Sequence, residues 1–198
     1  MTLIISIVLA YLLGAISFSY LITKLLLRDD IRKHGSGNAG ATNTLRVLGV
    51  FPAVLVLLLD VFKGVLAIWI AGWIGGGELA AAAAGLMAIV GHNWPIYYGF
   101  RGGKGVATTI GVFATLFLFP ALSVGAFAIF LIVITRFVSL GSLCFVVLAP
   151  ICALFFGDVP AVYAYVGLII AMLSIWRHRS NIQRLLNGTE NKIGKKGS

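Results

Sequence analysis

Long apolar stretches separated by short polar segments dominate the chain. The apolar stretches cover about residues 3–26, 51–74, 79–98, 106–135, 139–156 and 161–176. About 20 apolar residues are enough for a helix to cross the ~30 Å hydrocarbon core of a bilayer. The pattern therefore predicts an all-α integral membrane protein, built as a polytopic bundle of transmembrane helices.

The fourth apolar stretch, residues 106–135, is longer than one crossing needs. As a single helix it would be about 45 Å long, and Pro120 lies at its middle, where proline disrupts a helix. It is therefore predicted to form two short helices that meet at a turn near Pro120. The first stretch has no basic residue before Lys24, which favours a retained membrane helix over a cleaved signal.

The charges decide how often the chain crosses the membrane. Lys and Arg number 15 against six Asp and Glu, a net charge of +9, and basic residues favour the cytoplasmic side. With the N-terminus outside and seven helices, Lys104, Arg136 and the C-terminal tail from Arg177 all lie in the cytoplasm. A five-helix alternative, with one long span in each half of residues 106–176, keeps the tail inside but leaves Arg136 outside. Seven helices are therefore preferred.

No repeat or linker divides the chain, so residues 1–198 are predicted to form a single membrane-embedded domain. Cys144 and Cys152 are eight residues apart in one apolar stretch. That spacing is about 12 Å along a helix, too far for a disulfide. Asp60 and Lys63 are three apart in another apolar stretch and can pair across one helical turn. A structural ion pair is the favoured interpretation of these two residues.

The predicted membrane topology places three polar segments on the cytoplasmic face. The first is HGSGNAGATNTLR, residues 34–46. Its glycines allow backbone N–H groups to converge on an anion without a Cβ in the way, and an arginine can grip a phosphate with two parallel hydrogen bonds. The alternative is a flexible loop rich in turn formers. The candidate phosphate ligands are Ser36, Gly37, Asn38, Gly40, Asn43 and Arg46.

The second segment is GHNWPIYYGFRGGKG, residues 91–105. It fails the Walker pattern, because Tyr98 occupies the position of the first glycine and Gly105 replaces the Ser or Thr that follows the lysine. Nucleotide hydrolysis is therefore disfavoured. Gly102, Gly103 and Lys104 still precede a predicted helix start, where free N–H groups and the positive end of the helix dipole favour a phosphate.

The third segment is RHRSNIQRLLNGTE, residues 177–190. On a helix, His178 and Asn181 are three apart, and Arg177, Asn181 and Arg184 follow at spacings of four and three. One face is therefore predicted to carry an imidazole, a carboxamide and guanidiniums. A basic tail that attracts anionic lipid is the alternative interpretation. Ser139 and Ser142 lie on one face at the cytoplasmic end of their predicted helix and can add hydroxyl donors to the same site, although helix-packing serines are an equal alternative.

Three clusters of phosphate donors around a lipid-embedded bundle indicate a ligand with phosphate at one end and an acyl chain at the other. Phospholipid synthesis or transport follows from this. The six acidic residues are scattered and the three histidines are separate, so no metal site is predicted, and a metal-dependent lipid phosphotransferase is disfavoured. A transporter of phosphorylated metabolites is the alternative, but its binding site would be expected near the midplane.

Four segments, GSGNAGATNTLR, LDVFKG, GHNWPIYYGFRGGKG and RHRSNIQRLLNGTE, resemble the motifs of the bacterial acyl-phosphate:glycerol-3-phosphate acyltransferase (PlsY) family. The resemblance runs from residue 35 to residue 190. It implies transfer of a fatty acyl group from acyl phosphate to the 1-hydroxyl of glycerol 3-phosphate, giving lysophosphatidic acid and phosphate. It also implies seven helices in the bacterial plasma (inner) membrane, an active site facing the cytoplasm, and neither a cofactor nor a nucleic-acid partner. The oligomeric state, a monomer included, is left open.

The resemblance also assigns roles to individual residues. The donor is a mixed anhydride with a good leaving group, so orientation and charge stabilisation matter more than a strong nucleophile. A phosphate oxygen of the donor is the preferred base for the glycerol hydroxyl, and the His178 side chain is the alternative. The implied catalytic residues are Ser36, Arg46, Lys104, His178 and Asn181; the implied substrate-binding residues are His92, Ser142 and Arg177; the implied structural residues are Asp60, Lys63 and Glu190.

Overall fold

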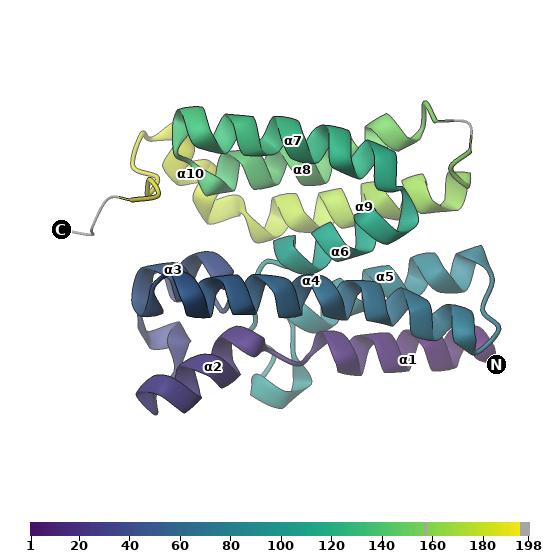
Figure 1. The fold of residues 1–198 in the computed structure, drawn as a ribbon, viewed down its shortest axis with the longest axis horizontal. Helices are drawn as coiled ribbons and strands as arrows, with labels where there is room; N and C mark the ends of the chain where they lie inside the picture. The colour runs from purple at the N-terminus through teal and green to yellow at the C-terminus, as the bar shows by residue number, and fades with distance from the viewer. Residues whose placement is uncertain (157, 195–198) are drawn as a thin grey trace. The chain divides into compact units, whose positions relative to one another are not determined.

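The computed structural model describes residues 1–156 and 158–194, and every regular element within them is a helix (Figure 1). This confirms the all-α prediction. The chain divides into two compact units, Met1–Leu116 and Phe117–Ser198. The prediction of a single domain stays a prediction.

The first unit contains the two glycine-rich segments. Its helices are α1 (Thr2–Gly14), α2 (Phe18–Leu27), η1 (Ile31–Lys33), α3 (Ala41–Leu48), α4 (Val50–Trp73), α5 (Glu78–Asn93), η2 (Ile96–Tyr98) and α6 (Val106–Leu116). The short elements η1 and η2 belong to the connections that precede α3 and α6, so both glycine-rich segments lead into a helix start.

The first apolar stretch is interrupted, although the sequence predicts one continuous helix there. Helix α1 ends at Gly14, and α2 begins at Phe18 after Ser17, whose hydroxyl accepts a hydrogen bond from the Tyr20 N–H. The interruption leaves the carbonyl of Ile16 outside both helices, and the Lys63 ammonium donates to it at 2.7 Å. Because Lys63 is 47 residues away, local sequence could not reveal this interruption.

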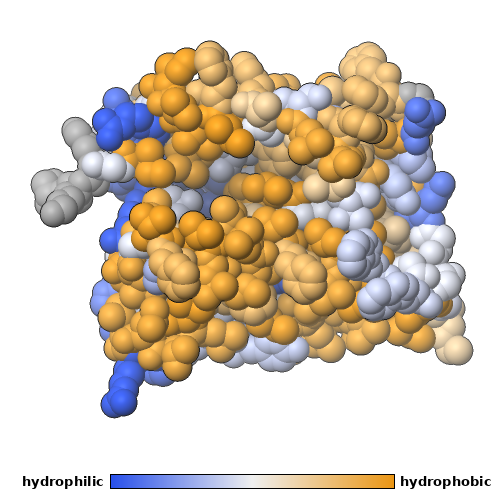
Figure 2. All heavy atoms as spheres, viewed as in Figure 1, coloured by the Kyte–Doolittle hydropathy of each residue, from blue (hydrophilic) through white to orange (hydrophobic). Residues whose placement is uncertain are grey.

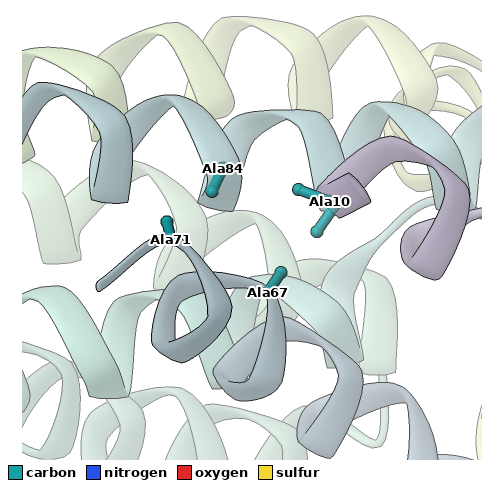
Figure 3. Packing of buried hydrophobic residues seen from close by; sticks show 5 residues of the cluster. Ala10, Ala67, Ala71 and Ala84 are labelled. Carbon is teal, nitrogen blue, oxygen red and sulfur yellow. The ribbon is translucent and has the colours of Figure 1, made fainter. Parts of the chain in front are cut away.

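Small residues pack α1, α4 and α5 closely together. Ala10, Ala67, Ala71, Ala84 and Ala88 form one buried cluster, four of which are labelled in Figure 3. On α1 and α5 the backbones themselves touch. A Cβ added to Gly14 would collide with the Ala88 carbonyl, and one added to Gly91 would collide with the Tyr11 carbonyl. Close backbone approach through small residues is typical of helix packing in membranes.

The second unit contains α7 (Leu118–Thr135), α8 (Val138–Ala153), α9 (Ala161–Arg177) and α10 (Arg179–Leu186). Residues 106–135 do form two helices, but the break lies at Phe117, three residues before the predicted turn at Pro120. Pro120 is the third residue of α7. A proline is tolerated in the first turn, because its missing N–H would have no intrahelical partner there. Cys144 and Cys152 are both free, as predicted.

Four segments are long and apolar enough to cross a membrane: Thr2–Leu27, Val50–Trp73, Glu78–Tyr98 and Leu118–Thr135. A fifth arises if α9 and α10, which meet at a bend of 62°, count as one span. The helices α6 and α8 have 11 and 16 residues, about 17 and 24 Å, shorter than a typical hydrocarbon core. Apolar side chains cover most of the face drawn in Figure 2. Seven crossings and the orientation stay predictions.

Candidate active site

The first glycine-rich segment folds around the side chain of Asn43. This residue is 1% exposed; its Oδ1 accepts from the Ser36 N–H at 2.8 Å, and its Nδ2 donates to the carbonyls of Ile31 at 3.3 Å and His34 at 3.0 Å. Both amide hydrogens are therefore used within the loop. Asn43 therefore supports the loop, and neither of its amide hydrogens remains for the predicted contact with a phosphate.

The same segment keeps other donors accessible. Ser36 and Arg46, on the second turn of α3, are exposed. The N–H groups of Gly37 and Gly40, by contrast, already donate to the carbonyls of His34 at 3.0 Å and Asn38 at 3.1 Å. Helix α3 begins after Gly40 without a side-chain cap. The first N–H groups of a helix have no intrahelical acceptor, and they carry the positive end of the helix dipole. Loop, helix start and arginine together make a surface suited to an anion.

The second glycine-rich segment caps the C-terminus of α5. The Gly102 N–H donates to the Asn93 carbonyl at 3.2 Å, and the Gly103 N–H donates to the His92 carbonyl at 3.1 Å. The predicted use of these two amides as phosphate donors therefore competes with bonds that they already make. A Cβ on Gly102 would collide with the His92 carbonyl, so glycine is needed here for close packing. The half-buried Lys104 follows directly, two residues before α6 begins.

The two glycine-rich segments meet at Gly103. A Cβ on Gly103 would collide both with the Ala39 carbonyl of the first segment and with His92 Nε2. No larger residue would let the chains approach in this way. The first two polar segments, which the sequence predicts on one membrane face, are therefore parts of one site.

Arg32 ties the two segments together and was missed by the sequence reasoning. Its guanidinium donates to Tyr98 O at 2.7 Å and to Arg101 O at 3.2 Å, and it pairs with Asp30 at 2.6 Å. The Arg32 hydrogen bonds hold the pKa of the Asp30 carboxyl below its usual range, against the opposing effect of burial. The acidic residue two positions before Arg32 was the available signal, but its contact partners are 66 and 69 residues away.

A buried charged cluster of Asp60, Lys63 and His92 lies next to the second segment. The predicted Asp60–Lys63 pair is confirmed, with Lys63 Nζ 2.7 Å from Asp60 Oδ1. His92 Nδ1 lies 3.0 Å from Lys63 Nζ and 3.6 Å from Asp60 Oδ1. The side chains of all three are at most 5% exposed. The resemblance implies that His92 binds substrate, but the structure places it in this buried cluster, against Gly103.

The third polar segment belongs to the second unit, where Glu190 is its centre. Glu190 Oε1 accepts from Ser139 Oγ at 2.9 Å and Asn181 Nδ2 at 2.7 Å, and Oε2 accepts from Arg184 Nε at 2.7 Å. Burial alone would raise the pKa of Glu190, but the hydrogen bonds from Asn181, Arg184 and Ser139 outweigh it and lower the pKa. Glu190 thus ties α10 to the start of α8. Ser142, also buried, follows Ser139 by one turn.

His178 lies at the bend between α9 and α10 and is 2% exposed. Its Nδ1 is 2.8 Å from the Ser174 carbonyl. A carbonyl can only accept, so Nδ1 carries the hydrogen and Nε2 keeps its lone pair in the neutral ring. That is the tautomer a general base at Nε2 requires. Arg177, half-buried, directly precedes it.

Comparison with known proteins gives matches to one family of enzymes. The family model described as "Glycerol-3-phosphate acyltransferase" matches residues 4–188. A glycerol-3-phosphate acyltransferase of Halalkalibacterium halodurans is 60% identical over 199 residues, covering 94% of this chain and 93% of the relative. One from Shouchella clausii is 58% identical and covers 98% of both chains.

Two solved structures share the fold. The crystal structure of PlsY, an integral membrane glycerol 3-phosphate acyltransferase, in its glycerol 3-phosphate form has a TM-score of 0.91 and 38% identity, covering 98% of this chain and 96% of that chain. The lysophosphatidic acid form of PlsY has a TM-score of 0.88 and 37% identity, with the same coverage.

Proposed function

The chain belongs to the glycerol-3-phosphate acyltransferase family, and from that premise we propose that acyl phosphate is its donor and the 1-hydroxyl of glycerol 3-phosphate its acceptor. Membership rests on the family model and on two relatives that are 60% and 58% identical. The chain is accordingly an integral membrane acyltransferase, and the transporter alternative is overturned. The donor, the hydroxyl and the residue roles are the finer parts of the proposal.

The meeting of two glycine-rich segments at Gly103 is the observation that carries this proposal. Acyl phosphate and glycerol 3-phosphate each bring a phosphate, so the site needs two separate sets of positive donors. The start of α3 with Ser36, Asn38 and Arg46 would hold one phosphate. Lys104 and the start of α6 would neutralise the other, where charge develops as it departs.

The proposed reaction is a direct acyl transfer. The glycerol hydroxyl oxygen attacks the carbonyl carbon of the acyl phosphate and a new ester C–O bond forms. The bond between that carbon and the phosphate oxygen breaks, inorganic phosphate leaves, and the hydroxyl proton ends on it. Arg46 and Lys104 stabilise negative charge during this exchange. No covalent acyl-enzyme is needed, because phosphate is a good leaving group.

The proposal also includes the membrane arrangement. The chain would cross the bacterial plasma membrane seven times, with the N-terminus outside and the active site facing the cytoplasm. The charge distribution supports this arrangement, because it brings Lys104, Arg136 and the basic tail to the side that favours positive charge. The third polar segment, with His178, Asn181 and Arg177, would then share a membrane face with the glycine-rich segments.

The test uses purified, detergent-solubilised protein with palmitoyl phosphate and glycerol 3-phosphate, and measures phosphate release. We expect release that needs both substrates, and a loss of about 100-fold or more in Lys104→Ala, comparable to removing one oxyanion-stabilising donor. Lys24→Ala is the matched control, because Lys24 is an exposed lysine on α2 that contacts the Arg28 carbonyl. Equal use of palmitoyl-CoA, or full activity of Lys104→Ala, would contradict the proposal.

A further inference from the structure

Lys63 sits among three acceptors in the buried interior of the first unit. Its Nζ lies 2.7 Å from the Ile16 carbonyl, 2.7 Å from Asp60 Oδ1 and 3.0 Å from His92 Nδ1. It also faces the ring of Phe18, 5.6 Å from the centroid. An ammonium has three hydrogens to donate. The carboxylate and the aromatic face both favour the charged form, in which Nζ donates to the Ile16 carbonyl and to His92 Nδ1 while it forms an ion pair with Asp60.

This arrangement dictates which nitrogen of His92 carries the proton. If Lys63 donates to Nδ1, that nitrogen must be the acceptor, and the hydrogen of the neutral ring sits on Nε2. His92 Nε2 is the atom that a Cβ on Gly103 would strike, next to the Ala39 carbonyl. The ammonium therefore sets a donor at the point where the two glycine-rich segments meet.

We propose that Asp60, Lys63 and His92 form a positioning relay, in which the Asp60–Lys63 pair fixes the Nε2–H tautomer of His92 and His92 holds the Gly102–Lys104 loop in its phosphate-binding conformation. The proposal rests on the proposed function for its phosphate ligand. All three are positioning residues, since they act through the loop that carries Lys104.

The cost of burying these groups supports a role beyond packing. A buried ion pair is often no more stabilising than apolar residues of similar volume, and ionisable groups at membrane depth are expensive. The relay also joins parts of the chain that are distant in sequence: the α1–α2 interruption through Ile16, α4 through Asp60 and Lys63, and α5 through His92. A cluster placed only to pack helices would not need to end at Gly103.

The tautomer can be measured directly. The chain has three histidines, so histidine labelled with ¹⁵N in both ring nitrogens gives three side chains by NMR, and the His92→Asn variant identifies the signals of His92. At pH 7 we expect His92 to be neutral, with hydrogen on Nε2 and none on Nδ1. Hydrogen on Nδ1, or a doubly protonated ring, would overturn the proposal. This measurement does not depend on turnover, so it stands even if the proposed donor is wrong.

Two substitutions separate positioning from packing. His92→Asn keeps an acceptor near the Nδ1 position for Lys63 and removes the Nε2–H donor, whereas His92→Gln keeps an N–H near Nε2 and removes the acceptor. We expect His92→Asn to unfold near the wild-type temperature but to lose about tenfold in kcat/KM, the effect of about one hydrogen bond. His92→Gln should lower the unfolding temperature and keep more activity than His92→Asn.

The two variants give a readout that a packing role alone would not produce. A packing role predicts that activity follows stability, so His92→Asn would then be the more active variant, and this outcome would contradict the relay. Absent turnover in the wild type would count against the proposed function, while the ¹⁵N tautomer would still decide the relay. Lys63→Met combined with Asp60→Asn, which leaves no unpaired buried charge, should let the His92 tautomers mix. An unchanged tautomer in that variant would also overturn the proposal.

Discussion

Two buried histidines hold opposite tautomers because their Nδ1 atoms face opposite partners. The Lys63 ammonium donates to Nδ1 of His92, and the Ser174 carbonyl accepts from Nδ1 of His178. One ring therefore offers an N–H at Nε2 and the other a lone pair. Histidine burial alone would not distinguish them, because both are at most 5% exposed. In each ring, the hydrogen-bond partner of Nδ1 therefore determines whether Nε2 can donate or accept a hydrogen bond.

We predict that His178 assists the reaction without being its base. In the proposed reaction a phosphate oxygen of the donor takes the hydroxyl proton, so His178→Ala should lower kcat by less than about 100-fold, the lower end for a lost general base. Single-turnover acyl transfer and the KM values of both substrates measure this. A larger fall in kcat with both KM values unchanged would instead make His178 the base.

The Glu190 hydrogen bonds predict a stability loss in acid. Their effect lowers the pKa of Glu190 from its usual value of 4.5, so the folded state binds this proton less readily than the unfolded state. The stabilisation is therefore fully present above about pH 4.5 and is lost as the pH falls below it through the folded-state pKa. Thermal unfolding of wild type between pH 6 and 3.5 should show this loss.

A neutral side chain at the same position provides the control for that titration. Glu190→Gln should have a lower unfolding temperature than wild type at pH 6, and the difference should shrink as the pH falls. Parallel curves for the two proteins would show that Glu190 does not carry the acid sensitivity.

The sequence identified the residue types of the site better than their roles. Glycine content, Arg46 and Lys104 were visible as an anion-binding pattern. The hydrogen bonds that use up Asn43, Gly102 and Gly103 could not be seen, since their partners are set by loop folding. Arg32 was missed for the same reason, because its contacts with residues 98 and 101 are formed only when the chain folds.

At the scale of elements, the α1–α5 contact depends on the absence of side-chain atoms. A Cβ on Gly91 would meet two backbone atoms of α1 and, at 2.8 Å, the N atom of Ala15, which caps this helix. Backbone atoms cannot rotate away, so Gly91→Ala should destabilise the protein by about 1–3 kcal/mol. Thermal unfolding in detergent measures this.

Gly72→Ala is the matched control for that interface. A Cβ there meets nothing within 4 Å, and replacing a helical glycine by alanine stabilises by about 0.5–1 kcal/mol. We therefore expect the two substitutions to shift the unfolding temperature in opposite directions. A loss of stability in both would mean that the helix glycines matter for reasons other than close packing.

Element positions followed from hydrophobicity, but element breaks did not. Each predicted apolar stretch contains at least one helix, because about 20 apolar residues have few alternatives in a bilayer. The interruption after Gly14 depends on the distant Lys63, and the break at Phe117 precedes the proline that the sequence suggested as its cause. Breaks are set by which freed carbonyls find partners, and that is a property of the packed structure.

At the scale of the whole molecule, Arg136 distinguishes seven crossings from five. Seven crossings put Arg136 in the cytoplasm with the tail, whereas five put it outside. Gly77 lies outside and Asn187 inside in both arrangements. All three positions are exposed, and a Cβ on Gly77 meets nothing within 4 Å, so cysteines placed there should be tolerated.

We predict that Arg136 is cytoplasmic, because the membrane potential and the positive-inside bias both favour a cation on that side. Single cysteines at Gly77, Arg136 and Asn187, each introduced with Cys144→Ser and Cys152→Ser, would be treated with a membrane-impermeant maleimide in spheroplasts and after lysis. Seven crossings require that Gly77→Cys reacts before lysis, and that Arg136→Cys and Asn187→Cys react only afterwards. Reaction of Arg136→Cys before lysis, with the other two as expected, would establish five crossings and remove the charge argument for a split of residues 106–135 into two spans.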